Sequence, residues 1–438
     1  MSSDAAAEPG PGLPELVLRA ARDLDKVDNA FDAELLLSTL LGSVYAGTLP
    51  DRGQALESFG RAFAEYLSAT DTAPARVAAA VLAALTRSAT PATGASVPDA
   101  GTMPAAGSTG NGATTDGGAS TDGGAGWSGG PPWLGALGAV RVTGGFAYGD
   151  RYGDQTSYMI SYAYEDELLG GPEHALVILV DHNFGLVKDL VIAAPAALVL
   201  GQLRESVATD EAAMTWLAEV EPATVRAASF GYLRATDNAA ELDDAESLTA
   251  NRALAGARLA LLPDRQLPQS AAEPSSAGAD KEGLIAEFLD SPEAQLSGLA
   301  GSSGDRREAV TYCLGLIIDF ADTRGGDALR WSPRAVEVFL LDWVHGRAVL
   351  DSRDARTLPD ALGTWVLWAG RRLGLPDVAL QATFDEVGER REEFARLCAT
   401  GERQSPAVRA MAKLIAEGVD LTDEEAVDTW LRTYQSDN

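Results

Sequence analysis

The feature that most limits the possible folds of this 438-residue chain is a long segment that cannot build a core. Residues 88–132 consist mainly of Gly, Ala, Ser, Thr and Pro. Such a composition buries too little apolar surface to offset the entropy that is lost on ordering. We therefore expect a flexible tether there, with separately folded modules on either side. The chain is long enough for several independent cores.

Residues 10–87 form the first expected module, and their apolar side chains have helical spacing. Leu56, Phe59 and Phe63 recur three or four positions apart, which places them on one face of a helix. The later segment PARVAAAVLAALTR is rich in small residues that permit close packing of helices. We expect a compact N-terminal helical module.

Residues 133–262 form the second expected module, which opens with four strand-like runs. In the second run, Tyr158, Ile160 and Tyr162 occupy alternate positions, which is the period of a β-strand. Short polar or glycine-containing connections join all four runs, so we expect an antiparallel meander rather than β-α-β units. Helical segments follow, and a Pro/Ser/Ala-rich joint at 263–280 ends the module.

Residues 281–438 have the pattern of an amphipathic helical bundle. Trp343, Trp365 and Trp368 are interpreted as its large core side chains. The sequence as a whole predicts an α+β protein. Its expected parts are an N-terminal helical module, a central antiparallel β-meander with helices, and a C-terminal all-α bundle.

The charge of the chain narrows the classes of partner. With 64 acidic and 34 basic residues, the formal net charge is −30, which opposes contact with nucleic-acid phosphates and anionic lipid. No stretch approaches the roughly 20 apolar residues of a membrane span. The N-terminal sequence MSSDAAAEPGPG lacks the pattern of a signal peptide. We therefore expect a cytoplasmic protein that binds neither nucleic acid nor membranes.

Several common catalytic motifs are missing from the sequence. No glycine-rich loop precedes a Lys-Ser or Lys-Thr pair, so we expect no P-loop nucleotide site. Three histidines are too few for a multi-histidine zinc site in this arrangement. Cys313 and Cys398 stand far apart in the sequence and are interpreted as packed thiols. The sequence identifies no cofactor.

One stretch, HALVILVDHNFGLVKD at 174–189, carries the clearest candidates for chemistry. Asp181, His182, Lys188 and Asp189 flank a turn in an otherwise apolar hairpin. Because side chains alternate between the two faces of a strand, the loop length decides which of these groups meet.

Two loop lengths are compatible with the turn. A three-residue loop that ends at a left-handed Gly185 places Asp181 opposite Val187. Asp181 and Asp189 then share one face, as half of a cation site or an acid/base pair would. A two-residue loop instead places Asp181 opposite Lys188 and His182 diagonal to Asp189, and these contacts mainly stabilise the hairpin. We expect the three-residue loop, since glycine stands at its third position.

The preceding loop, YGDRYGDQTSY, adds Asp150 and Asp154 as candidate metal ligands. Hard divalent cations prefer several oxygen ligands, so a metal site would require these carboxylates to meet Asp181 and Asp189 in one pocket. The spacing does not match a calcium-binding EF-hand loop, and Gly and Asp also favour turns for conformational reasons. The sequence leaves both interpretations open.

Two stretches, 149–189 and 330–376, resemble segments of a family of uncharacterised proteins from high-GC actinobacteria. The resemblance covers the middle and C-terminal modules. It implies a bacterial cytosolic setting and assigns no catalytic residue.

Two classes of function are compatible with these observations. We favour a non-catalytic interaction or regulatory protein with protein partners, because jointed modules and a large helical surface accompany the missing catalytic motifs. The alternative is a hydrolase or other metal-assisted enzyme centred on the meander. Carboxylates that are scattered rather than gathered in one pocket would favour the first class.

Overall fold

The fold is seen in a computed structural model of the whole chain. It describes residues 12–47, 51–86, 130–240, 242, 246–264, 281–323, 327–419 and 423–437. Residues 88–129 of the expected tether and residues 265–280 of the expected joint therefore lie outside the described residues.

The chain divides into two compact units, and both are discontinuous in sequence. Unit 1 combines Met1–Arg141, Ala163–Pro172 and Thr249–Leu262. Unit 2 combines the remaining segments, Val142–Tyr162, Glu173–Leu248 and Pro263–Asn438. The segment Thr249–Leu262, which the sequence analysis assigned to the central module, thus belongs with the N-terminal helices.

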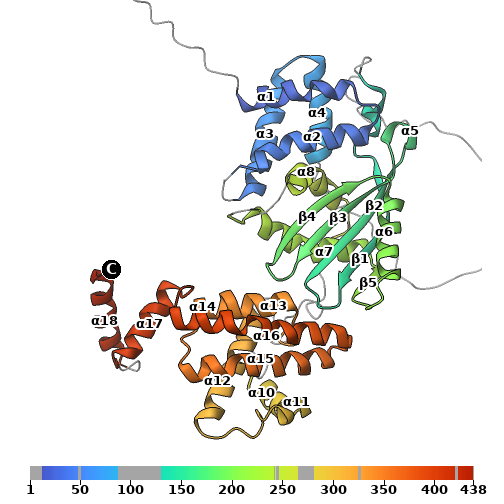
Figure 1. Cartoon of the computed structure of the whole chain (residues 1–438). Helices are drawn as coiled ribbons and strands as arrows, with labels where there is room; N and C mark the ends of the chain where they lie inside the picture. The colour runs from blue at the N-terminus through green and yellow to red at the C-terminus, as the bar shows by residue number, and fades with distance from the viewer. Residues whose placement is uncertain are drawn as a thin grey trace, which may run out of the picture. The chain divides into compact units, whose positions relative to one another are not determined.

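Unit 1 is built mainly from helices (Figure 1). A 3₁₀ turn (Ala21–Asp25) follows the first of them, and the core includes the buried Leu37, Phe63 and Val81. Asn29 caps the second helix, since its side chain accepts a hydrogen bond from the backbone N–H of Asp32 at 2.9 Å. The helices that contribute to this unit are α1 (Leu13–Ala20), α2 (Ala30–Tyr45), α3 (Arg52–Ala69), α4 (Ala73–Thr86), the short α5 (Glu167–Gly170) and most of α8 (Glu246–Ala260).

A buried charged cluster joins distant segments inside unit 1. The carboxylate of Glu34 in α2 accepts hydrogen bonds from Arg258 Nη2 of α8 at 2.5 Å and from the Tyr164 hydroxyl at 2.8 Å. Its other oxygen accepts from the backbone N–H of Gly138 at 2.6 Å. Glu34 is 0% exposed, so this pairing offsets the cost of removing a carboxylate from water.

An antiparallel five-stranded sheet forms the β part of the fold, with the strand order β4-β3-β2-β1-β5 (Figure 1). The first four strands confirm the expected meander. The fifth strand was not expected; it pairs with β1, so that Tyr148 stands opposite Leu217. The strand bounds are β1 (Val140–Asp150), β2 (Gln155–Tyr164), β3 (His174–Asp181), β4 (Leu186–Ala193) and β5 (Thr215–Glu219).

Helices of unit 2 pack on both faces of the sheet. Helix α6 (Ala196–Ala208) packs on the face that carries Met159 and Ala175. Helix α7 (Pro222–Asp237) contacts β3 and β4, and its Thr236 hydroxyl accepts the backbone N–H of Val187 at 2.7 Å. The hairpin between β3 and β4 therefore rests on a helix through a specific hydrogen bond.

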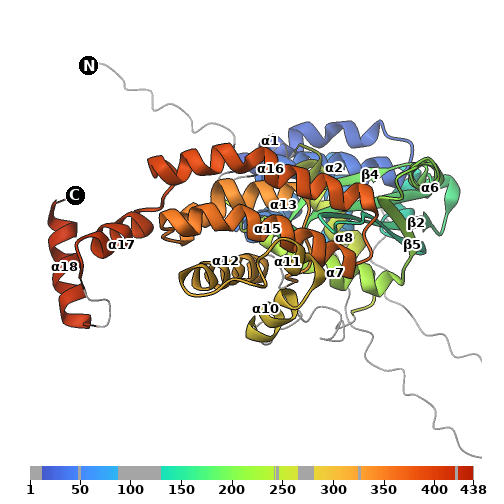
Figure 2. The same ribbon diagram turned by 60° about the horizontal axis from the view of Figure 1, so that its bottom comes forward.

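The C-terminal part of unit 2 is helical (Figures 1 and 2). Trp365 and Trp368 are buried in its core and Trp343 packs against it, which confirms their expected role. The indoles of Trp331 and Trp365 both donate to the carbonyl of Ala328, at 3.0 and 2.9 Å. The helices are α10 (Lys281–Leu289), α11 (Pro292–Leu296), α12 (Asp305–Asp322), α13 (Pro333–Val338), a π-helical turn (Phe339–Trp343), α14 (Val344–Arg347), α15 (Ser352–Arg372), α16 (Asp377–Thr400), α17 (Pro406–Ala416) and α18 (Glu424–Asp437).

The expected α+β class is thus correct, with helices at both ends of the chain and an antiparallel sheet between them. Within the described ranges, no helix combines the length and the apolar character needed to cross a bilayer.

Candidate functional site

A pocket of about 800 Å³ lies at the hairpin that the sequence singled out. Its walls combine acidic, basic and apolar side chains. Of the predicted candidates, Asp150, Asp154, Asp181, Lys188 and Asp189 all line it. The remaining lining residues are Gln155, Leu179, Asn183, Phe184, Leu186, Val187, Leu242, Leu248 and Arg334.

The turn of the hairpin differs from both expected forms. Asp181 pairs with Leu186, so the loop contains four residues, and the backbone N–H of Gly185 donates to the carbonyl of Asp181 at 2.9 Å. Gly185 adopts the expected left-handed conformation, with φ of 70°. The expected pairing of Asp181 with Val187 is wrong, and so is the alternative pairing with Lys188.

An irregularity in β4 explains which residues then face the pocket. The register places Val187 opposite Val180 and Asp189 opposite Leu179, so Lys188 is an extra residue in the strand. Such a bulge shifts the alternation of side chains by one position. Asp181 and Asp189 therefore line the same pocket, as the sequence predicted, but for a different geometric reason.

The carboxylate of Asp181 serves the turn itself. Its Oδ1 accepts hydrogen bonds from the backbone N–H groups of Asn183 and Phe184, at 2.9 and 3.3 Å. Its Oδ2 accepts from Gln155 Nε2 at 3.3 Å. This is an Asx turn, in which an aspartate replaces a backbone acceptor.

Asp150 has an equivalent role in the connection between β1 and β2. Its two carboxylate oxygens accept hydrogen bonds from the backbone N–H groups of Asp154, at 3.2 Å, and Gln155, at 2.8 Å. Asp189 accepts hydrogen bonds from the backbone N–H of Leu190, at 2.7 Å, and from the Ser247 hydroxyl. These acids therefore hold local backbone structure around the pocket.

His182 does not line the pocket. Its Nδ1 lies 2.9 Å from the Tyr232 hydroxyl and its Nε2 lies 3.0 Å from Thr156 Oγ1. Burial raises the pKa of the Tyr232 hydroxyl, which therefore stays protonated at neutral pH. With its proton on Nε2, His182 accepts from Tyr232 and donates to Thr156. The imidazole thus connects strand β2 with helix α7.

Two cations reach the pocket wall. Lys188 is exposed, and Arg334 belongs to α13, far along the sequence. Arg334 Nη1 lies 2.5 Å from Glu337 Oε2, and its guanidinium stands 5.8 Å from the centre of the Phe184 ring. The sequence analysis missed Arg334, because no local pattern connects it with the hairpin.

The geometry bears directly on the metal-site interpretation. Four carboxylates line one pocket, but among the described residues no group of three or more His, Cys, Asp or Glu side chains is arranged to hold a metal ion. Asp150, Asp181 and Asp189 already accept hydrogen bonds from protein donors. A cation would have to compete with those contacts.

A second site, which the sequence analysis missed, lies on the C-terminal helices. Two hollows of about 620 and 410 Å³ adjoin, since Leu299, Arg306 and Asp360 line both. We name them together the arginine groove. Its lining residues are Glu293, Leu296, Ser297, Leu299, Asp305, Arg306, Arg353, Arg356, Thr357, Pro359, Asp360, Gly363, Thr364, Leu367, Arg371, Phe384, Asp385, Val387, Gly388 and Arg391.

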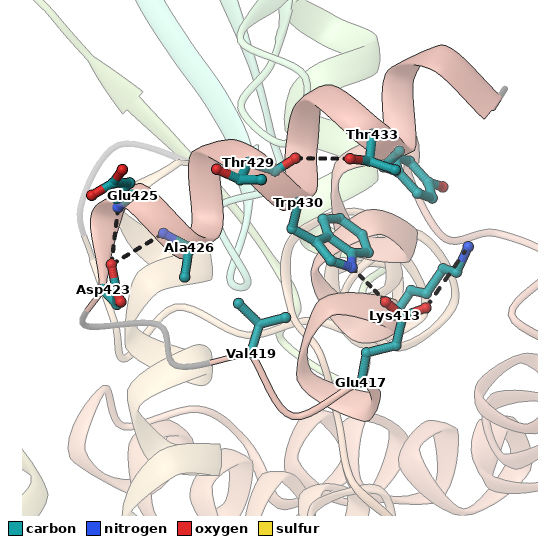
Figure 3. A pocket seen from close by; sticks show the side chains of 10 residues that line it. Lys413, Glu417, Val419, Asp423, Glu425, Ala426, Thr429, Trp430 and Thr433 are labelled. Carbon is teal, nitrogen blue, oxygen red and sulfur yellow. Dashed lines mark hydrogen bonds and ion pairs between the residues drawn. The ribbon is translucent and has the colours of Figure 1, made fainter.

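A further pocket of about 740 Å³ lies between α17 and α18 (Figure 3). The indole of Trp430 points toward α17 and donates to Glu417 Oε2 at 2.5 Å. Trp430 also stacks on Tyr434, with the ring centres 4.9 Å apart, and Lys413 Nζ stands 5.2 Å from the centre of the Tyr434 ring. The polar and aromatic groups here hold the two helices together.

Comparisons with known proteins assign no role to any of these sites, because no family model, curated protein or solved structure matches the chain.

Proposed function

We propose that the protein is a non-catalytic interaction or regulatory protein of the cytosol, which binds a protein partner through the arginine groove. One observation carries the proposal: two adjoining hollows are lined by four helices, α11, α12, α15 and α16, and combine apolar with charged side chains. Specific protein interfaces have this composition, with an apolar centre inside a polar border.

The apolar part of the groove supports this role. Leu296 at the end of α11 is 89% exposed, and Phe384 of α16 is 41% exposed. Gly363 and Gly388 add no side chain to the floor, and a Cβ at Gly388 would meet no atom within 4 Å. The surface is thus open to a side chain from another molecule.

The polar groups of the hairpin pocket support a non-catalytic role. Asp181 and Asp150 accept backbone N–H groups at the turns, and His182 connects β2 with α7. A general base needs a carboxylate or imidazole that is positioned toward substrate. Asp150 and Asp181 instead hold turns, and His182 joins two elements of the fold.

Photocrosslinking in the native host tests the proposal. A benzophenone amino acid at position 296 should give discrete crosslinks to a partner protein. The crosslinks should disappear in a Gly388→Trp background, because the indole would fill the groove. Gly201→Trp in α6 is the matched control, since a Cβ there also meets no atom within 4 Å. Identical crosslinks in the two tryptophan variants would contradict docking in the groove.

A second candidate function is a hydrolase or other metal-assisted enzyme at the hairpin pocket. The observation that favours it is that Asp150, Asp154, Asp181 and Asp189 all line one pocket. Calorimetric titration with Mg²⁺, Mn²⁺ and Ca²⁺ separates the two candidates. Heat of binding that is lost in Asp181→Asn would support the enzyme. No heat in the wild type, with a lower melting temperature in Asp181→Asn, would leave the carboxylates a structural role.

A further inference from the structure

We propose that the occupant of the arginine groove is an amphipathic helical segment of a partner protein, with carboxylate side chains that bind Arg306 and Arg356. The inference rests on the function proposed above and specifies the chemistry of the partner. Three properties of the groove lead to it: its length, its apolar floor and the charge of one end.

The length of the groove fits a helix of about four turns. Helix α15 lines it from Arg356 to Arg371, and at 1.5 Å per residue this distance is about 22 Å. Helices α15 and α16 run side by side along it (Figures 1 and 2). A seam between two packed helices is a common place for a third helix to dock.

The floor of the groove indicates that the docked segment has an apolar face. Leu367 and Val387 line it together with the exposed Leu296 and Phe384, and Gly388 leaves room for a partner side chain. A helix that places apolar side chains at i, i+3, i+4 and i+7 presents one stripe to such a surface.

The charge at one end indicates the polar face of the segment. Three arginines, Arg306, Arg353 and Arg356, line the hollow where α12 and α15 begin. This gathering contrasts with the chain as a whole, in which acidic residues outnumber basic ones by 64 to 34. The positive end therefore stands out against a negative background, and it favours an anionic partner.

The other charges of the groove are largely matched within the protein. Three ion pairs span it: Arg353 with Asp305 at 3.0 Å, Arg371 with Glu293 at 2.5 Å, and Arg391 with Asp360 at 2.6 Å. Gln381 Nε2 donates to the carboxylate of Asp385 at 2.6 Å.

Two cations remain for the partner. Among the described residues, the side chains of Arg306 and Arg356 form no ion pair or hydrogen bond, although Arg356 contributes to lowering the pKa of the nearby Asp351 carboxyl. Helix α12 begins beside them at Asp305, and its N-cap residue, Gly304, provides no side-chain cap. Arginine binds carboxylates through paired N–H donors, which makes Asp or Glu the fitting side chains of the partner.

A display selection tests the inference on the full chain. The probe is a library of 16-residue peptides with leucine at helical spacing and random residues elsewhere. Enriched peptides are then synthesised and their affinities measured by fluorescence anisotropy. We expect enrichment of Asp and Glu, and an affinity that falls as salt is added.

Matched variants test separately whether the peptide docks in the arginine groove and whether its acidic side chains bind Arg306 and Arg356. Gly388→Trp should weaken binding by at least about tenfold, whereas Gly201→Trp should leave it unchanged. Arg306→Glu combined with Arg356→Glu should also weaken it by at least about tenfold. The control for net charge is Arg409→Glu combined with Arg432→Glu, on helices outside the groove. Lysine in place of the acids of a selected peptide should restore its affinity for the Arg306/Arg356 variant.

The possible outcomes distinguish a failure of the acidic partner from a failure of docking in the groove. Selected peptides that depend on Gly388 but are neutral or basic, or that tolerate both groove charge reversals, would overturn the acidic partner and leave docking in the groove intact. If Gly388→Trp weakens the binding of none of the selected peptides, the proposed function is overturned together with this inference.

Discussion

Removing the guanidinium from the buried cluster of unit 1 should destabilise the protein more than almost any other single change. The substitution Arg258→Met keeps an apolar stem of similar length and removes the charge. It leaves the carboxylate of Glu34 buried at 0% exposure, with only the Tyr164 hydroxyl and the Gly138 N–H as donors. Breaking a buried ion pair in this way costs about 3–5 kcal/mol, a large share of the 5–15 kcal/mol that stabilises a typical domain.

Urea unfolding followed by circular dichroism measures this cost. Hydrogen exchange of peptides from α2 and α8 assigns the loss to unit 1. The double variant Glu34→Gln/Arg258→Met removes the unpaired charge and keeps an acceptor for Gly138, so it should be more stable than Arg258→Met alone. A cost below about 1 kcal/mol for Arg258→Met, or a double variant that shows the sum of the two single losses, would refute the reasoning.

Three further predictions concern other parts of the chain. Burial raises the pKa of the Cys313 thiol to about 12 and that of Cys398 to about 11, so neither should react with iodoacetamide at pH 8 until urea unfolds the protein; rapid labelling of native Cys313 would contradict its burial. Burial lowers the pKa of His345 below 6.5, so the unfolded chain binds the proton more readily than the folded chain. The contribution of His345 to stability should therefore be present above pH 6.5 and lost as the pH falls through the lowered pKa. The substitution His345→Leu should make the urea midpoint less dependent on pH over that range. The net charge of −30 should prevent appreciable binding to duplex DNA at physiological salt, and a salt-sensitive micromolar complex in a mobility-shift titration would count against that expectation.

The sequence was sufficient to predict the first four strands, because each is a local run of strand-forming residues bounded by polar or glycine-containing connections. It missed β5 (Thr215–Glu219), which has five residues and depends on pairing with the distant β1. The loop of the β3–β4 hairpin was also mispredicted. Glycine at position 185 favoured a three-residue loop, but the side chain of Asp181 stabilises a longer one by accepting two backbone N–H groups.

The candidate sites also differ in how far their residues could be predicted from local sequence. Asp181, Lys188 and Asp189 could be selected from sequence, since they lie in one hairpin. Arg334 and the arginine groove could not, because their neighbours come from helices that are distant in the sequence. Two glycines within helices, Gly363 and Gly388, were the available signal for a hollow surface, since glycine disfavours helix interiors unless packing or access requires it.

The three-segment composition of unit 1 affects how the protein can be synthesised and dissected. A ribosome delivers the chain from the N-terminus, so α2 leaves the exit tunnel long before the residues that complete its packing. Until Arg258 is available, Glu34 lacks its counter-charge, so the packing of α2 is completed only after α8 has been synthesised. For the same reason, a fragment that stops before Thr249 is a poor choice for expression. A chain in which linkers replace the intervening segments of unit 2 and join all three segments would be the better starting point for isolating unit 1.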